Sequence, residues 1–114
     1  MPGRIDWTEK DDPTIGILGG LGPEATVHLY TLILKYTPAK KDQDHIPTII
    51  YSNTLIPNRP ECIEQENHEN IIKIMGDTAM KLEEAGADLI LMPCNTAHYY
   101  HQAIQDQVDI PLLD

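Results

Sequence analysis

One stretch of the sequence, residues 89–98, constrains the fold more than any other. It reads Leu-Ile-Leu-Met-Pro-Cys-Asn-Thr-Ala-His. A short continuous apolar run that ends at a proline is typical of a strand buried on both faces, as in a parallel sheet. Asn95 or Thr96 can cap a following helix, because their side chains accept hydrogen bonds from its free N–H groups. Cys94 is therefore expected at the carboxyl end of a central strand, where open α/β sheets bind ligands.

The expected position of Cys94 has a chemical and a structural interpretation. A helix N-terminus stabilises negative charge, and it therefore favours the thiolate over the thiol. A free cysteine titrates at about 8.5, and such a position lowers that value. In the structural interpretation, Cys94 is a small buried hydrophobic residue, as free cysteines often are.

Short apolar segments alternate with amphipathic ones along the rest of the chain. Strands are predicted over residues 14–18, 48–51, 88–92 and 110–113, and helices over residues 24–36, 68–85 and 97–105. This β-α-β-α-β-α-β order predicts an α/β fold, a three-layer α/β/α arrangement with a parallel four-stranded sheet and right-handed crossovers. Residues 1–13 are polar and charged, and we expect them to be a flexible N-terminal extension of a single domain, residues 14–114.

Charge and composition argue against several classes of protein. The net charge of −10 disfavours binding to phosphate backbones and to anionic membranes, so neither nucleic acid nor membrane is an expected partner. No apolar run is long enough to span a membrane, and no N-terminal stretch has the order of a signal peptide. Two cysteines are too few for a disulfide framework, which fits a reducing compartment. We therefore expect a cytoplasmic protein.

A glycine-rich turn, Gly19-Gly20-Leu21-Gly22-Pro23, follows the first predicted strand. Residues 20–25 fit the permissive form of the dinucleotide fingerprint, G-x-G-x-x-A. However, Glu24 repels a pyrophosphate, and the second strand ends without the acidic residue that binds the ribose. A turn whose amides hold a carboxylate is the better interpretation, and a purely structural turn is the alternative.

Arg59 lies in the predicted loop after the second strand, which a parallel sheet places at the same edge as Cys94. Its planar guanidinium is suited to bidentate binding of a carboxylate, although an ordinary surface arginine is equally compatible with the position. A metal site is the remaining option, drawn from Cys62, His68, Cys94, His98 and His101. These residues lack paired C-x-x-C or H-E-x-x-H spacing, so we expect no metal.

Taken in order, these motifs resemble those of the aspartate/glutamate racemase family, and of its aspartate racemase branch in particular. The matching segments are residues 15–26 (IGILGGLGPEAT), Asn53 with the following Ile-Pro-Asn-Arg that ends at Arg59, and residues 92–98 (MPCNTAH). The Gly-Ala-Asp of residues 86–88 fits as well, and the resemblance runs from residue 14 to the end.

The resemblance implies a cofactor-independent racemase of a small acidic amino acid, aspartate or glutamate. Members of the family resemble two similar α/β lobes that face each other, and each lobe supplies one cysteine. One thiolate takes the α-proton, and the other thiol donates a proton to the opposite face. Carried over to this sequence, the first-lobe catalytic cysteine is Cys94. The substrate-binding residues are Asn53, Arg59, Asn95, Thr96 and the turn residues Gly19, Gly20 and Leu21.

The resemblance also implies that this chain is one lobe of a two-lobe racemase fold. Family members are about twice as long, and their second cysteine lies in the other half; Cys62 is not its counterpart. The chain then represents a truncated gene product, a fragment or one part of a two-chain enzyme, inactive alone. A lone lobe exposes apolar surface, so a homodimer is expected. The alternatives are a related isomerase or hydantoin-type racemase that uses the same cysteine, or a non-catalytic lobe.

Overall fold

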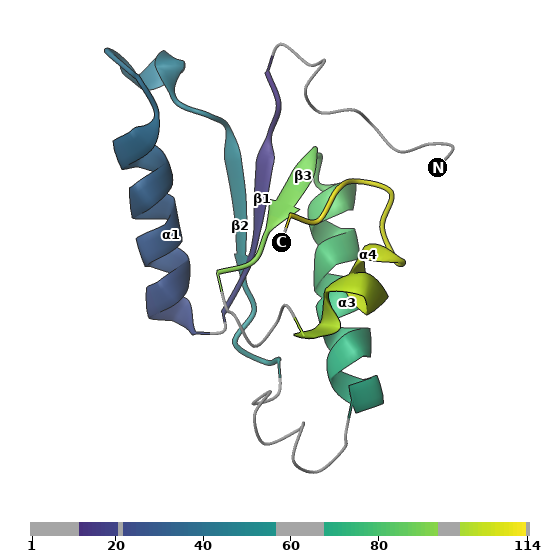
Figure 1. The fold of residues 1–114 in the computed structure, drawn as a ribbon. Coiled ribbons are helices and arrows are strands. Elements are labelled where there is room, and N and C mark those ends of the chain that lie inside the picture. Colours follow the sequence, from purple (N-terminus) through teal and green to yellow (C-terminus); the bar gives the residue numbers. More distant parts are fainter. Residues whose placement is uncertain (1–11, 21, 57–67, 94–98, 114) are drawn as a thin grey trace.

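Strands and helices alternate along the chain as predicted (Figure 1). A computed structural model describes residues 12–20, 22–56, 68–93 and 99–113. The elements are β1 (Ile15–Gly19), α1 (Pro23–Tyr36), the 3-10 helix η2 (Asp42–Asp44), β2 (Thr48–Ser52), α3 (His68–Glu84), β3 (Leu89–Leu91) and α4 (His101–Gln105). Helix η2 lies between the helix predicted over residues 24–36 and the strand predicted over residues 48–51. The N-terminal extension lies, up to residue 11, outside the described residues.

The sheet is parallel, with the strand order β2-β1-β3. Strand β1 is central, and all five of its residues are buried. The register pairs Gly19 with Ser52, so β1 and β2 end level with each other at one edge of the sheet. The chain leaves both strands at this edge, where the sequence predicts the functional residues.

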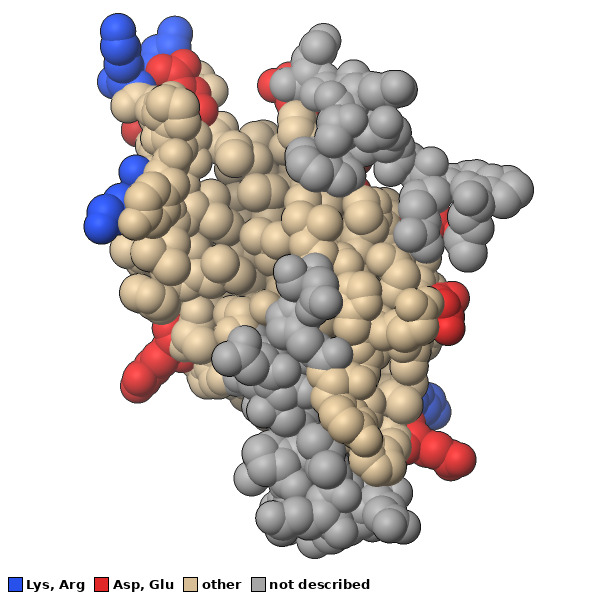
Figure 2. Space-filling view, viewed as in Figure 1, with Lys and Arg blue, Asp and Glu red and all other residues tan. Residues whose placement is uncertain are grey.

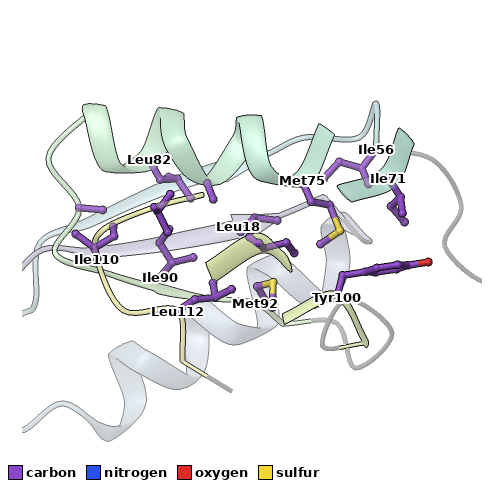
Figure 3. Packing of buried hydrophobic residues seen from close by; sticks show 14 residues of the cluster. Leu18, Ile56, Ile71, Met75, Leu82, Ile90, Met92, Tyr100, Ile110 and Leu112 are labelled. Carbon is purple, nitrogen blue, oxygen red and sulfur yellow. The ribbon is translucent and has the colours of Figure 1, made fainter. Parts of the chain in front are cut away.

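Helices cover both faces of the sheet, which confirms the three-layer α/β/α arrangement (Figure 1). Because side chains alternate along a strand, Leu18 points to one face and Ile17 to the other. Leu18 belongs to the larger apolar cluster, which α3 and α4 complete with Ile71, Met75, Leu82 and Ile104 (Figure 3). Ile17 belongs to a smaller cluster, against which Leu29, Tyr30 and Ile33 of α1 pack.

Local sequence signals explain where the helices begin and end. Pro23 lies in the first turn of α1. Backbone N–H groups in the first turn have no partner within the helix, so a proline there costs no helical hydrogen bond. Helix α3 buries Ile71, Met75 and Leu82 at helical spacing. Gly86, with φ +109°, follows its last turn in the left-handed conformation that glycine adopts without strain. No helix among the described residues is long and apolar enough to cross a membrane.

The described sheet has three strands, so the prediction of a fourth strand over residues 110–113 is wrong. This segment meets β3 in one parallel bridge between Ile90 and Leu112. The Ile90 N–H donates to the Pro111 carbonyl, and the Leu113 N–H donates to the Ile90 carbonyl, both at 2.9 Å. Strand β3 is only three residues long, so it offers a short edge for pairing.

A glutamine side chain occupies the other edge of residues 110–112. The buried Gln105 carboxamide accepts from the Leu112 N–H at 2.8 Å and donates to the Ile110 carbonyl at 2.9 Å. It therefore satisfies the backbone groups that a neighbouring strand would satisfy. The predicted helix over residues 97–105 is seen as α4, while residues 94–98 lie outside the described part of the chain.

Replacing Gln105 by leucine should destabilise the chain by about 2–4 kcal/mol, because a buried N–H and a buried carbonyl both lose their partner. Urea unfolding followed by circular dichroism measures the change. Gln102→Leu on the same helix is the matched control, because the Gln102 side chain bonds Asp106 on the surface. It should shift stability by less than about 0.5 kcal/mol. Equal effects of the two substitutions would contradict the strand-like role of Gln105.

Candidate active site

The turns that follow β1 and β2 are in direct backbone contact. Gly20 has φ +101°, and a Cβ atom added to it would lie 2.4 Å from the carbonyl carbon and oxygen of Asn53. The Asn53 N–H donates to the Gly19 carbonyl at 3.1 Å, one residue beyond the end of β2. Three of the predicted site residues, Gly19, Gly20 and Asn53, are thereby brought together at the carboxyl edge of the sheet.

Thr26, in the first turns of α1, holds the glycine turn in place. Its buried hydroxyl accepts from the Gly20 N–H at 2.9 Å and donates to the Gly22 carbonyl at 3.1 Å. A Cβ atom on Gly19 would lie 2.4 Å from the Thr26 side chain, so only glycine fits there. The Gly20 amide therefore donates within the turn rather than to a ligand.

The sequence analysis missed Thr26. The sequence does contain a signal that could have identified this residue. Thr26 lies at helical spacing from Tyr30 and Ile33, on the face of α1 that packs against the sheet. A single threonine on an otherwise apolar buried face needs hydrogen-bond partners. The nearest candidates are the backbone groups of the glycine turn that precedes the helix.

The side chain of Asn53 is bonded to the protein at both ends. Its Nδ2 donates to Thr78 Oγ1 on α3 at 2.9 Å, and its Oδ1 accepts from the Leu55 N–H at 3.0 Å. Thr78 in turn donates to the Ile74 carbonyl at 2.8 Å. Asn53 thus attaches the segment after β2 to helix α3, in addition to lying at the predicted site.

The other predicted site residues lie outside the described part of the chain. These are Leu21, Arg59, Cys94, Asn95 and Thr96. The residues that precede their segments are described: Ile56 before residues 57–67 and Pro93 before residues 94–98. Ile56 and Met92 are both buried in the larger apolar cluster (Figure 3), so these two segments begin from the same packed region.

The described residues contain no group of three His, Cys, Asp or Glu side chains that could hold a metal ion. Two histidines weighed as ligands have other contacts: His68 Nδ1 meets the Tyr100 hydroxyl, and His101 Nε2 meets the Leu112 carbonyl. On the face shown in Figure 2, the described acidic side chains lie scattered around the periphery. The described acidic residues therefore suggest no cation site on that face.

The family profile for Asp/Glu/hydantoin racemases matches residues 18–114. The chain belongs to this family. The resemblance found in the sequence is thereby confirmed. Within the family, a similar protein is the broad specificity amino-acid racemase RacX of Bacillus subtilis, which is 36% identical over 105 residues. That match covers 87% of this chain and 44% of RacX.

Two solved structures of the racemase family support the α/β fold. An aspartate racemase from Picrophilus torridus is 35% identical, with a TM-score of 0.77 over 90% of this chain and 43% of its own. An aspartate racemase homologue from Pyrococcus horikoshii is 32% identical, with a TM-score of 0.73 over 89% of this chain and 44% of its own. The chain thus spans less than half the length of these relatives.

Replacing Gly20 by alanine should destabilise this racemase-family chain by about 1–3 kcal/mol or more, because φ +101° is strained for alanine and the new Cβ meets Asn53. Gly22→Ala is the control, because Gly22 has φ −98° and a Cβ atom added to it would have no atom of the described residues within 4 Å. It should change stability by less than about 1 kcal/mol. Denaturant unfolding measures the free energy of unfolding of both variants. Equal stability of the Gly20→Ala and Gly22→Ala proteins would refute the close approach of Gly20 to Asn53.

Proposed function

We propose that this chain is the first lobe of a cofactor-independent amino-acid racemase, with Cys94 as its proton-transferring thiol and aspartate as the favoured substrate. The observation that carries the proposal is the family match over residues 18–114, which includes Cys94 and Arg59. The names of the similar proteins support the reaction class, because RacX is a broad specificity amino-acid racemase and the Picrophilus torridus protein is an aspartate racemase.

The proposed reaction needs a base on one face of the α-carbon and an acid on the other. The Cys94 thiolate removes the α-proton and becomes a thiol, while the electron pair of the broken C–H bond remains on the substrate as a carbanion. A second thiol then protonates the opposite face and becomes a thiolate. Charge and protons balance, and the product is the mirror-image amino acid. Reversing the roles of the two thiols returns the starting enantiomer.

An α-proton is a weak acid, so the site must stabilise the developing negative charge. Hydrogen bonds from Asn95 and Thr96 and the exclusion of water are the means that we assign to this chain. The Arg59 guanidinium is assigned to a carboxylate of the substrate, which suits a bidentate pair. A local cation matters here, because the chain as a whole carries a charge of −10 and repels an anionic substrate.

The second thiol is assigned to the part of the relatives that this chain does not match, since the chain covers 44% of RacX. The turns described above suit this division. Gly20 and Asn53 hold two strand ends together at one edge of the sheet, and we assign the facing lobe to this edge. The family also includes hydantoin racemases, so a hydantoin is the second candidate substrate.

Alkylation should modify Cys94 faster than Cys62 in the folded protein at neutral pH. The reason is the expected position of Cys94 between a strand end and a helix start, which favours the thiolate. Iodoacetamide labelling with peptide mapping by mass spectrometry measures both rates, and Cys94→Ser and Cys62→Ser proteins confirm the assignment of the adducts. If Cys62 reacts first and Cys94 reacts only after denaturation, Cys94 is a core residue and the proposal fails.

The 114-residue chain alone should racemise L-aspartate about 10²–10⁴-fold more slowly than a chimaera in which the unmatched part of the Picrophilus torridus racemase follows residue 114. One thiol serves only one face, and bulk water is a poorly positioned acid. Chiral chromatography, without pyridoxal phosphate and with a metal chelator, measures the rate. Robust racemisation by the chain alone would overturn the two-thiol mechanism. Full activity of the Cys94→Ser chimaera would overturn the assignment of Cys94.

A further inference from the structure

Helix α1 has more apolar surface than the sheet covers. Apart from Thr26, its polar side chains form one stripe at spacings of four, three and four residues: Glu24, His28, Thr31 and Lys35. The other residues of the helix are apolar or aromatic, so more than half of its circumference is apolar. A helix that packs on one neighbour needs an apolar stripe of about 100°. Because Thr26 is the one buried residue of α1, apolar surface is left for a second contact.

Part of this uncovered surface lies next to the polar stripe. Val27, Tyr30 and Leu34 form a row at helical spacing, which we call the α1 row. Val27 is 65% exposed and Leu34 is 38% exposed, whereas Tyr30 packs partly against the smaller apolar cluster. Helix α1 also leaves part of the sheet open, because Ile50 is 41% exposed although it is the register partner of the fully buried Ile17. One helix thus covers this side of the sheet incompletely.

The charges of α1 complement a second copy of the same helix. Glu24 lies in its first turn and Lys35 in its last turn, both in the stripe that borders the α1 row. Figure 2 shows a basic and an acidic side chain toward the two ends of the side formed by α1, with uncharged surface between them. The chain as a whole carries a charge of −10, so most pairs of surfaces on two copies repel each other. Helix α1 is neutral, and its two charges are opposite and lie at opposite ends.

An antiparallel arrangement about a two-fold axis satisfies the row and the charges together. It places Val27 against the partner's Leu34 and Glu24 against the partner's Lys35. The midpoint of the first pair lies between residues 30 and 31, and that of the second lies between residues 29 and 30. Because a helix rises about 1.5 Å per residue, the two midpoints nearly coincide and one axis serves both pairs. Such a contact uses each pair twice and closes at two copies.

We propose that two copies of this chain associate through α1, with the α1 rows packed antiparallel and Glu24 of each copy paired with Lys35 of the other. The Lys35 ammonium lies 5.4 Å from the ring centroid of its neighbour Tyr36. This contact is exposed and weak, so the flexible lysine side chain is able to reach the partner's Glu24 instead. None of these residues belongs to the proposed racemase site, so the dimer surface is independent of the proposed function.

Sedimentation velocity of the whole 114-residue chain, between about 10 µM and 1 mM, tests the surface. Interfaces below about 1,200 Å² are typical of weak complexes, so a single helix pair should give a concentration-dependent dimer. Val27→Gln should weaken association about 10-fold or more, because each dimer buries this side chain twice. Leu55→Gln is the matched control, because Leu55 is 83% exposed in the turn after β2. It should change the dissociation constant less than about 2-fold.

Charge variants test the two ion pairs in the same measurement. Glu24→Lys and Lys35→Glu should each weaken the dimer about 3- to 10-fold, because like charges then meet at both ends of the helix pair. The Glu24→Lys/Lys35→Glu double variant exchanges the two charges and should restore the wild-type dissociation constant.

A mixture of two variants tests the orientation of the helices. Val27→Glu and Leu34→Lys should each be monomeric alone, because a charge then faces an apolar side chain twice in every dimer. Mixing the two should restore association, because the introduced carboxylate and ammonium then face each other and the remaining Val27 and Leu34 pack together. In a parallel pair neither match occurs, and the mixture stays monomeric.

A wild-type chain that is monomeric at about 1 mM would overturn the proposal. Association that Leu55→Gln abolishes and Val27→Gln leaves intact would overturn it as well, because the copies then meet at the sheet edge near Leu55. A mixture of Val27→Glu and Leu34→Lys that stays monomeric would rule out the antiparallel pairing. Circular dichroism checks the fold of each variant. The charge variants at the exposed Glu24 and Lys35 decide the question if an apolar substitution unfolds the chain.

Discussion

The contact between the Gly20 turn and the backbone of Asn53 is the constraint on which the candidate site depends. Two parallel strands can end level with each other only if the chain leaves them without a collision, and a side chain on Gly20 would occupy the space of the Asn53 carbonyl. Thr26 completes the arrangement from the opposite side by bonding the Gly20 amide. The turn is thus held by a close approach to the backbone after β2 and by one buried hydroxyl on α1.

The helices cover the two faces of the sheet with apolar clusters of different size. Helix α1 covers one face with a small apolar cluster and begins directly after the glycine turn. Helices α3 and α4 cover the other face with the larger cluster, which also buries Ile56, Met92 and Tyr100 next to the segments that carry Arg59 and Cys94. The larger cluster therefore contains described residues that flank, in the sequence, both segments of the proposed site.

Several polar side chains of the chain bond segments that lie outside the helices and strands. Asn53 reaches Thr78 on α3, the Glu83 carboxylate accepts from the N–H groups of Asp109 and Ile110, and Gln105 occupies the edge of residues 110–112. Each bond joins a helix to a segment that follows a strand or a helix. Such bonds lower the number of unsatisfied backbone groups in a chain whose sheet has only three described strands. Glu83 and Gln105 both bond residues of the segment after α4, which meets β3 in one bridge.

The sequence by itself determined the types and order of the main elements, because apolar runs, helical spacing, and Pro and Gly boundaries are local signals. It also determined the family, since the glycine turn, the Arg59 segment and the MPCNTAH motif are contiguous patterns. Only the tertiary structure decided the bonding of Asn53, the role of Thr26, the pairing of His68 with Tyr100, and the reduction of the fourth strand to one bridge. The physical reason is that a side-chain hydrogen bond depends on which distant backbone or side-chain groups packing brings within about 3 Å. Gln105 is the clearest case, because nothing in its helical neighbourhood indicates that its carboxamide replaces a strand.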